Sequence, residues 1–261
     1  MNRVHLIRAG AALAAALALT AGPLAAADKP VVTVFAAASL REAFDAAAPA
    51  FTKATGYPVR FSYGGSDTLV AQLLQGAPAD VFASANEAQM KRALDASAVV
   101  APRDFARNQL VVIVPANDTA VTTIADLGKS GTKVVLAAPT VPVGTYARQA
   151  FATLAKDATY GTDFATRVQA NVVSEETDVK AVATKISLGE GDAGVVYATD
   201  VTPSIASKVK VLHFPSGSAP EATYPIAVTK SAPNADGARA FVTFITSPQG
   251  LAFLKARGFE E

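Results

Sequence analysis

The sequence predicts an α/β protein that is built from two lobes. Apolar segments rich in β-branched residues alternate with segments whose apolar residues recur at helical spacing. Strands that alternate with helices favour parallel sheets with helices on both faces. Two such series follow each other along the 261 residues, and no low-complexity linker separates them. We therefore expect two doubly wound lobes, each with its own sheet.

The first series covers residues 28–108. Its predicted strands are residues 31–37, 59–63 and 80–84. Helices are expected from Ser39 to residue 55, over 68–75 and over 87–95, and Pro49 should kink or split the first of them. The stretch 103–108 reads as a polar break before the second series.

The second series covers residues 109–223. Predicted strands lie at 109–115, 133–138, 168–173, 193–197 and 209–214, and predicted helices at 123–129, 145–158 and 179–186. Residues 224–229 then form a strand that runs back to the first series, followed by an amphipathic helical region over 235–259. This pattern predicts lobe I from residues 28–108 and 224–261, and lobe II from residues 109–223.

The N-terminal 27 residues have the pattern of a secretory signal peptide. A short basic segment precedes an apolar run over residues 9–21, and Ala25-Ala26-Ala27 forms a small-residue cleavage site. A retained N-terminal anchor is the alternative. The chain has no cysteine, so lipid attachment to cysteine and disulfides are both excluded. We expect a periplasmic protein after cleavage.

Charge and composition argue against several classes of partner. The sequence has 23 basic and 22 acidic side chains, and cleavage would remove Arg3 and Arg8. A nearly neutral chain gives no reason to expect nucleic acid or an anionic membrane as partner. If the ligand is an anion, local donors must hold it.

The case for an enzyme is weak. The two histidines are His5, in the predicted signal peptide, and His213, in an apolar strand. The sequence contains no G-x-S-x-G, H-E-x-x-H or P-loop motif. A cation site that pairs Tyr63 or Tyr197 with Asp67 or Asp200 remains an alternative. We expect no enzymatic activity, no cofactor and no site for a bare metal cation.

Small residues recur where predicted strands lead into helices. Ligands of open α/β sheets bind beyond the carboxyl ends of the strands, and helix N-termini attract anions. Facing lobes would bring the junctions to one cleft, where Tyr197 adds a phenol donor. Such a site suits a compact, fully deprotonated tetraoxoanion. The alternative is that each junction is an ordinary turn and that Ser39 is only an N-cap. The four junctions are Ala38-Ser39-Leu40, Gly65-Ser66-Asp67, Pro142-Val143-Gly144 and Thr177-Asp178-Val179.

An ordered set of motifs resembles one known family, the periplasmic molybdate-binding proteins of ABC transporters. The resemblance implies a type II periplasmic-binding-protein fold, whose two α/β lobes are joined by a hinge. It also implies that the oxyanion is held by the residues that match the family's site: Ser39, Ser66, the amides of Val143 and Val179, and Tyr197. The motifs are VFAAASLREAF (34–44), SYGGSDTLVAQ (62–72), GAPADVFASA (76–85), NQLVVIVP (108–115), VPVGTYA (141–147), DVKAV (178–182), GVVYATD (194–200) and YPIAV (224–228).

The same resemblance implies a function. We expect a monomeric receptor that captures molybdate, and also tungstate, and delivers it to an inner-membrane ABC permease. A receptor for sulfate or another small oxyanion is the alternative in the same class. An exported metal-cation carrier or enzyme is the alternative in a different class.

The sequence departs from the family pattern at three positions. Val143 stands where alanine is common, and Ser66 follows two glycines instead of other serines. Asp67 beside an anion is unfavourable unless it points away, for example to cap its own helix.

Overall fold

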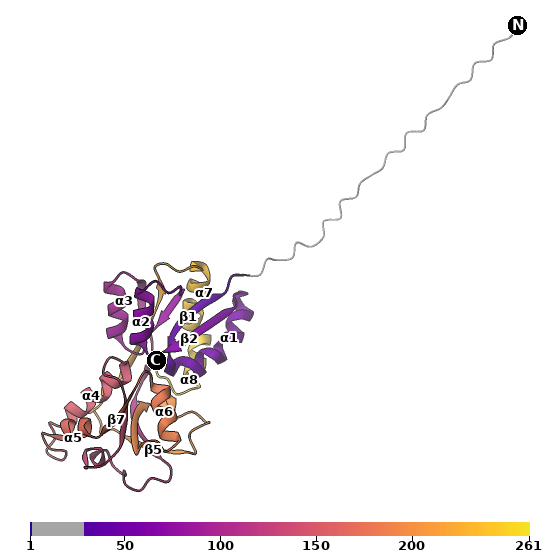
Figure 1. The fold of residues 1–261 in the computed structure, drawn as a ribbon. Coiled ribbons are helices and arrows are strands. Elements are labelled where there is room, and N and C mark those ends of the chain that lie inside the picture. Colours follow the sequence, from indigo (N-terminus) through magenta and orange to yellow (C-terminus); the bar gives the residue numbers. More distant parts are fainter. Residues whose placement is uncertain (2–28) are drawn as a thin grey trace.

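The protein consists of two α/β lobes, each built around a five-stranded sheet (Figure 1). A computed structural model describes residue 1 and residues 29–261. Apart from Met1, the predicted signal peptide lies outside the described residues. The exact lobe boundaries at residues 109 and 224 stay a prediction. Within the described part of the chain, no helix is long and apolar enough to cross a membrane.

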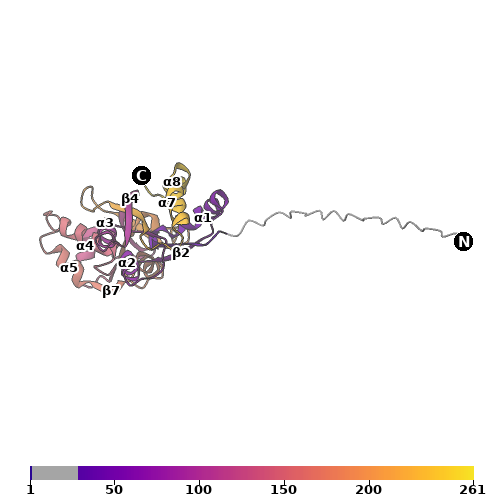
Figure 2. The same cartoon turned by 90° about the horizontal axis from the view of Figure 1, so that it is seen from above.

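The sheet of lobe I has the strand order β2-β1-β3-β10-β4. Strand β1 pairs in parallel with β2 and β3, whereas β10 is antiparallel to β3 and β4. Figure 2 shows α1, α7 and α8 gathered on one side of this lobe. The elements are β1 (Val32–Ala37), η1 (Ala38–Leu40), α1 (Arg41–Thr55), β2 (Val59–Gly64), α2 (Ser66–Leu74), β3 (Val81–Ala83), α3 (Glu87–Asp95), β4 (Val99–Asn108), β10 (Ala222–Thr229), α7 (Ala235–Ile245) and α8 (Pro248–Lys255).

The sheet of lobe II has the same plan, in the order β7-β6-β8-β5-β9. Strand β6 is parallel to β7 and β8, whereas β5 is antiparallel to β8 and β9. The elements are β5 (Leu110–Pro115), η2 (Ile124–Gly128), β6 (Val134–Ala137), α4 (Pro142–Leu154), α5 (Phe164–Ala170), β7 (Val172–Glu176), α6 (Val179–Ser187), β8 (Ala193–Tyr197), η3 (Ala198–Asp200) and β9 (Val209–His213).

The expectation of parallel sheets was wrong for one strand in each lobe. The reversed strands are β5 and β10, which are the strands that enter each lobe from the other one. The parallel strands run towards the junction of the lobes, whereas a strand that arrives from the opposite lobe starts at that junction and runs away from it. The two sheets are therefore mixed, while the carboxyl ends of their parallel strands still face the junction of the lobes.

Three local predictions were also wrong. Residues 168–173 are not one strand, because α5 ends at Ala170 and buries Phe164 and Val168, which are four residues apart on one helical face. The supposed polar break at 103–108 belongs to β4, an edge strand on which Phe105 and Ala106 are buried. Finally, α1 begins at Arg41 after a short 3-10 turn and is not split at Pro49, while a kink there stays a prediction.

Aromatic side chains pack helix α1 against helix α7 in lobe I. Phe44 and Phe51, one face of α1, both meet the ring of Phe241 edge-on, at centroid distances of 5.5 and 5.2 Å. All three side chains are fully buried. Burying aromatic rings of this size stabilises the lobe strongly, so the turn between β1 and α1 sits on a rigid base.

Candidate functional site

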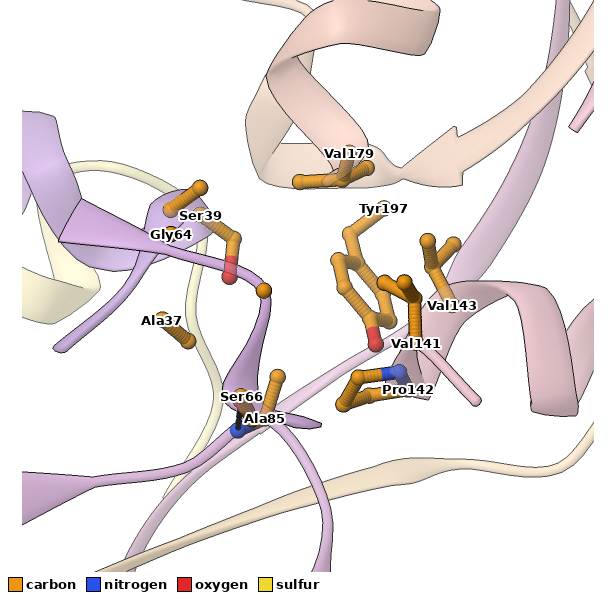
Figure 3. Close-up of a pocket in the computed structure, with 12 residues that line it drawn as sticks. Ala37, Ser39, Gly64, Ser66, Ala85, Val141, Pro142, Val143, Val179 and Tyr197 are labelled. Carbon is orange, nitrogen blue, oxygen red and sulfur yellow. Dashed lines mark hydrogen bonds between the residues drawn. The ribbon is translucent and has the colours of Figure 1, made fainter. Parts of the chain in front are cut away.

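The four predicted junctions converge on one small cavity between the lobes (Figure 3). Two junctions come from lobe I, at the starts of η1 and α2, and two from lobe II, at the starts of α4 and α6. No charged side chain is among the described residues that line the cavity. All five predicted site residues line it, together with small or apolar neighbours: Ala37, Ala38, Gly64, Gly65, Ala85, Val141 and Pro142.

Ser39 reaches the cavity from the turn between β1 and α1. It lies in η1, and the N-cap residue of α1 is Leu40, so Ser39 is not merely the cap of that helix. The side chain is buried, and its Oγ lies 2.9 Å from Tyr224 Oη on β10. In Figure 3 the hydroxyls of Ser39 and Tyr197 approach the cavity from opposite lobes.

Ser66 is the first residue of α2, directly after the N-cap Gly65. Its Oγ accepts a hydrogen bond of 3.0 Å from the backbone amide of Ala85, so its own proton remains available to another acceptor. Gly65 is required here, because a Cβ at this position would collide with the carbonyl oxygen of Thr177 in lobe II. The lobes are thus in close contact at the rim of the cavity.

Lobe II contributes the N-termini of two helices. Helix α4 begins with Pro142, so the amide of Val143 lies in its first turn. Helix α6 is capped by Asp178, whose Oδ1 accepts from the amides of Lys180 at 2.8 Å and Ala181 at 3.1 Å. The amide of Val179, at the first helical position, is then left without an intrahelical acceptor. Two helix starts directed at one cavity favour an anion there.

Tyr197 ends β8 and brings a phenol into the same space. The residue is buried, and its Oη has no hydrogen-bond partner among the described residues. Burial, with the Tyr224 phenol nearby, raises the pKa of Tyr197 well above its ordinary value, so the group stays protonated. A buried donor without an acceptor costs about 1–3 kcal/mol, which a bound acceptor would recover.

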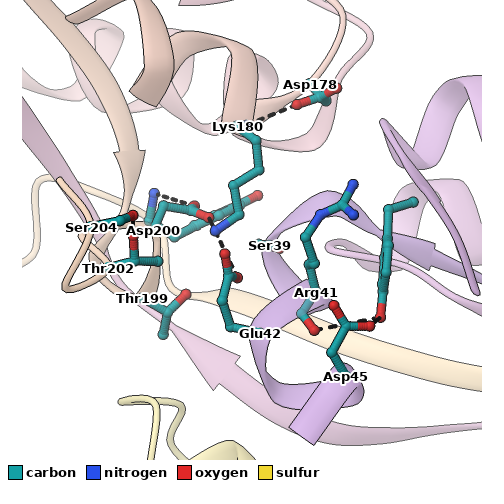
Figure 4. Close-up of polar contacts among 12 residues, drawn as sticks. Ser39, Arg41, Glu42, Asp45, Asp178, Lys180, Thr199, Asp200, Thr202 and Ser204 are labelled. Atoms are coloured by element: carbon teal, nitrogen blue, oxygen red, sulfur yellow. Dashed lines mark hydrogen bonds and ion pairs between the residues drawn. The ribbon is translucent and has the colours of Figure 1, made fainter. Parts of the chain in front are cut away.

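A charged cluster lies beside the cavity but does not line it (Figure 4). Lys180 Nζ is 2.8 Å from Glu42 Oε2 of lobe I and 3.0 Å from Asp200 Oδ1 of lobe II. Burial raises the pKa of Asp200 to about 6, although Lys180 acts to lower it. Burial acts to lower the pKa of Lys180, but the carboxylates of Asp200 and Glu42 outweigh it and raise that pKa. The positive charge of Lys180 is therefore paired with carboxylates from both lobes.

Asp67 does not cap its own helix. Its Oδ2 accepts a hydrogen bond of 2.7 Å from Thr140 Oγ1 in lobe II, and Asp67 is absent from the lining of the cavity. The predicted conflict between this carboxylate and an anion is avoided in this way. The contact is also a second polar bridge between the lobes.

The alternative cation site is not assembled. Tyr63 Oη donates to Asp45 Oδ1 at 2.7 Å, not to Asp67, and Asp200 is paired with Lys180. The part of the chain that the structure describes contains no group of three or more His, Cys, Asp or Glu side chains that could hold a metal ion.

Sequence reasoning missed Tyr224 and Asn108. Tyr224 contacts Ser39 across 185 positions of the chain, and Asn108 Nδ2 lies 3.5 Å from Tyr224 Oη. Both side chains are buried polar groups next to the two chain crossings. A polar residue at each predicted lobe boundary, Asn108 before residue 109 and Tyr224 after residue 223, was the available signal.

Together, the fold and the cavity define a two-lobed binding protein of the type II periplasmic class, with a site of uncharged donors between its lobes. The pattern of the bacterial extracellular solute-binding protein family matches residues 32–260. The molybdate-binding protein ModA of Mycobacterium tuberculosis is 38% identical over 231 residues, which cover 87% of this chain and 84% of the relative. ModA of Escherichia coli is 33% identical over 260 residues, covering 96% and 95%.

A solved structure has the same fold. The periplasmic molybdate-binding protein of Azotobacter vinelandii superposes with a TM-score of 0.75 at 22% identity, covering 88% of this chain and 99% of that one. This chain belongs to the bacterial extracellular solute-binding proteins, and its relatives place it in the ModA family of molybdate-binding proteins.

Proposed function

We propose that this protein captures molybdate in the interlobe cavity for an ABC transporter. The observation that carries the proposal is the convergence of three hydroxyls and two free helix-start amides on a space without charged side chains. Fixed donors of this kind replace the hydration shell of a dianion without a counter-charge. The names of the relatives support the same ligand.

Tungstate has the same charge and shape as molybdate, so we propose that it also binds through Ser39, Ser66, Val143, Val179 and Tyr197. Molybdenum is then carried as an oxyanion, and the protein needs no cofactor and carries out no covalent chemistry. Sulfate shares the charge and tetrahedral shape but is smaller. Donors held at fixed positions would leave its hydrogen bonds too long, so size provides the discrimination.

Ligand binding should close the lobes. Ser39 and Ser66 belong to lobe I, whereas Val143, Val179 and Tyr197 belong to lobe II. Only when the lobes meet can both sets donate to one anion, so the anion stabilises the closed state by its greater affinity for it. We propose that the closed monomer delivers its ligand to an inner-membrane ABC permease, from the periplasm and after loss of residues 1–27.

Titration calorimetry with molybdate, tungstate, sulfate and phosphate tests the proposal. We expect heat of binding with molybdate and tungstate, and none at the same concentrations with sulfate or phosphate. Binding of sulfate without molybdate would instead favour the sulfate receptor. Binding of ferric ion, or turnover of a substrate, would favour the metal-cation carrier or the enzyme.

A further inference from the structure

A buried chain of hydrogen bonds leads from the interior to Ser39. Ser39 Oγ lies 2.9 Å from Tyr224 Oη, and Asn108 Nδ2 lies 3.5 Å from the same phenol oxygen. All three side chains are buried, with exposures of 3% for Ser39, 0% for Tyr224 and 1% for Asn108. Tyr224 does not line the cavity, and its hydroxyl is connected to the lining through the hydrogen bond with Ser39.

The other hydrogen bonds of Asn108 fix which of its side-chain atoms faces Tyr224. Its Oδ1 accepts a hydrogen bond of 3.0 Å from the amide of Gln109, and its Nδ2 is 2.7 Å from Thr199 Oγ1. The group that faces Tyr224 is therefore the NH₂ group, which can only donate.

The direction of the next bond follows from this orientation. Among the described residues, the hydrogen-bond partners of Tyr224 Oη are Asn108 Nδ2 and Ser39 Oγ. Because Asn108 offers only hydrogen atoms, Ser39 Oγ is the acceptor available to the phenol proton. The opposite direction would leave that proton buried without an acceptor, which is unfavourable. Burial also raises the pKa of Tyr224 well above its ordinary value, so the proton is present.

The direction of the hydrogen bond between Tyr224 and Ser39 affects which anions can bind in the cavity. On the basis of the proposed oxyanion site, we propose that Tyr224 is a positioning residue that donates to Ser39 and so forces Ser39 to present its proton to the cavity. A hydroxyl can otherwise either donate or accept. Ser66 is held in the same sense, because it already accepts from the amide of Ala85.

The ligand class that this arrangement disfavours is the protonated oxyanion. A monohydrogen phosphate dianion carries an O–H that needs an acceptor, whereas molybdate accepts at every oxygen. With Ser39 and Ser66 both committed to donating, neither serine can receive that proton. The hydrogen bond from Tyr224 therefore contributes to selectivity as well as to affinity.

The test compares molybdate with inorganic phosphate at about pH 8, where phosphate is mainly the monohydrogen dianion. Affinities are measured by calorimetry, with phosphate as a competitor of bound molybdate, for the wild-type protein, Tyr224→Phe, Ser39→Ala and the double variant. Tyr224→Phe retains the ring contacts with Phe259 and Tyr197 and removes only the hydroxyl.

In Tyr224→Phe we expect molybdate affinity to fall by about tenfold, while phosphate affinity falls less or rises. In the Ser39→Ala background, Tyr224→Phe should change molybdate affinity by less than about twofold, because Tyr224 then has no serine hydroxyl to orient. Tyr197→Phe is the contrast: that phenol lines the cavity itself, so Tyr197→Phe should still weaken binding in the Ser39→Ala background.

Asn108→Asp provides an isosteric second variant should Tyr224→Phe fail to fold. A carboxylate would accept the phenol proton, so Ser39 would donate to Tyr224 and turn a lone pair towards the cavity. Molybdate and monohydrogen phosphate are both dianions, so the added charge affects both alike. We expect the ratio of molybdate to phosphate affinity to fall by about tenfold or more.

An unchanged ratio in the folded variants, or an undiminished effect of Tyr224→Phe in the Ser39→Ala background, would overturn the role of Tyr224 and leave the molybdate site in place. Absence of molybdate binding by the wild-type protein would overturn the proposed function, and this inference with it.

Discussion

The two lobes supply the cavity with different chemistry. Lobe I contributes the side-chain hydroxyls of Ser39 and Ser66, whereas lobe II contributes the main-chain amides of Val143 and Val179 together with the phenol of Tyr197. Both lobes use the same local plan, in which a strand leads into a helix that starts at the cavity. The comparison shows that the start of a helix can supply hydrogen-bond donors either from a side chain or from the backbone.

This difference decides how each lobe responds to substitution. A hydroxyl donor is lost when serine becomes alanine, but a backbone donor is lost only when the N–H itself is removed. The serines are held in direction by neighbouring hydrogen bonds, from Ala85 for Ser66 and from Tyr224 for Ser39. The amides are held by helix geometry and, at α6, by the Asp178 cap.

Val179→Pro should have the largest effect on binding. Val179 is the first residue of α6 and follows Asp178, whose φ of −160° and ψ of 171° are compatible with a following proline. The fold should persist while the N–H is lost, and molybdate affinity should fall by about 3 kcal/mol, or roughly 100-fold. Calorimetry measures the loss. Val179→Ala keeps the amide and should bind nearly as the wild type does; equal losses in both variants would refute a main-chain role.

Asp200→Asn tests the buried carboxylate that holds the backbone of Tyr197. Asp200 Oδ2 accepts a hydrogen bond of 3.2 Å from the Tyr197 amide. The pKa of Asp200 is raised from 3.8 to about 6. Between these values the folded protein binds more protons than the unfolded one, so this group makes stability fall as pH rises. The stability of Asp200→Asn relative to the wild type should therefore increase by about 2–3 kcal/mol between about pH 4 and pH 7.

Chemical denaturation at a series of pH values measures this difference. Asp126→Asn is the control of opposite sign: hydrogen bonds from Lys129 and two backbone amides outweigh burial and hold the pKa of Asp126 below its usual range. Its contribution is present at neutral pH and is lost as pH falls. A constant difference between Asp200→Asn and the wild type would count against the raised pKa.

Ser66→Ala should weaken molybdate binding by about 2 kcal/mol, because a hydrogen bond to a charged ligand is lost. Ser84→Ala is the matched control in the same lobe, since Ser84 is buried but bonds to the Asn86 carbonyl oxygen and does not line the cavity. Its molybdate affinity should stay at the wild-type value. Loss of affinity in both variants, measured by calorimetry, would point to a general disturbance of lobe I.

Tyr197→Phe should weaken binding by about 1.5 kcal/mol without destabilising the unliganded protein. The phenol oxygen has no partner in the described structure, so its removal breaks no internal hydrogen bond. Calorimetry and thermal unfolding without ligand measure the two effects. A lower unfolding temperature with unchanged affinity would assign the hydroxyl to the fold instead of the ligand.

Glu42→Gln should have the smallest effect. The Glu42–Lys180 ion pair joins the lobes, but its side chains are 38% and 21% exposed, so it should favour closure by only about 0.5 kcal/mol. Molybdate affinity should fall by about twofold at low salt and less at high salt. Asp95→Asn breaks the exposed Lys91–Asp95 pair within α3 and should leave affinity unchanged. The interlobe role fails if the two variants behave alike.

Some features of the fold and the site can be predicted from the sequence, and others cannot. Serines after small-residue turns are visible as candidate donors, and the recurrence of the junctions, with the family resemblance, directs attention to Val143 and Val179. The reversed directions of β5 and β10 were not predictable from periodicity, because they depend on which lobe a strand comes from. Residues 164–170 were missed because a short helix with only two buried apolar residues gives a weak period.

The hydrogen bond between Ser39 and Tyr224 was likewise beyond the sequence, because β10 brings together residues 185 positions apart. The interlobe charges were missed for a similar reason. Lys180 could be recognised as a residue of the first turn of α6, but its partner Glu42 lies on α1 and its partner Asp200 on η3, both far away in the sequence.

Crystals grown with molybdate and measured at the molybdenum absorption edge would test the central claim most directly. We predict one anomalous peak in the interlobe cavity, with anion oxygens within about 3 Å of Ser39 Oγ, Ser66 Oγ, Tyr197 Oη and the amide nitrogens of Val143 and Val179. A molybdenum peak elsewhere, or an anion held by lysine or arginine side chains, would contradict the account of a site made from uncharged donors of both lobes.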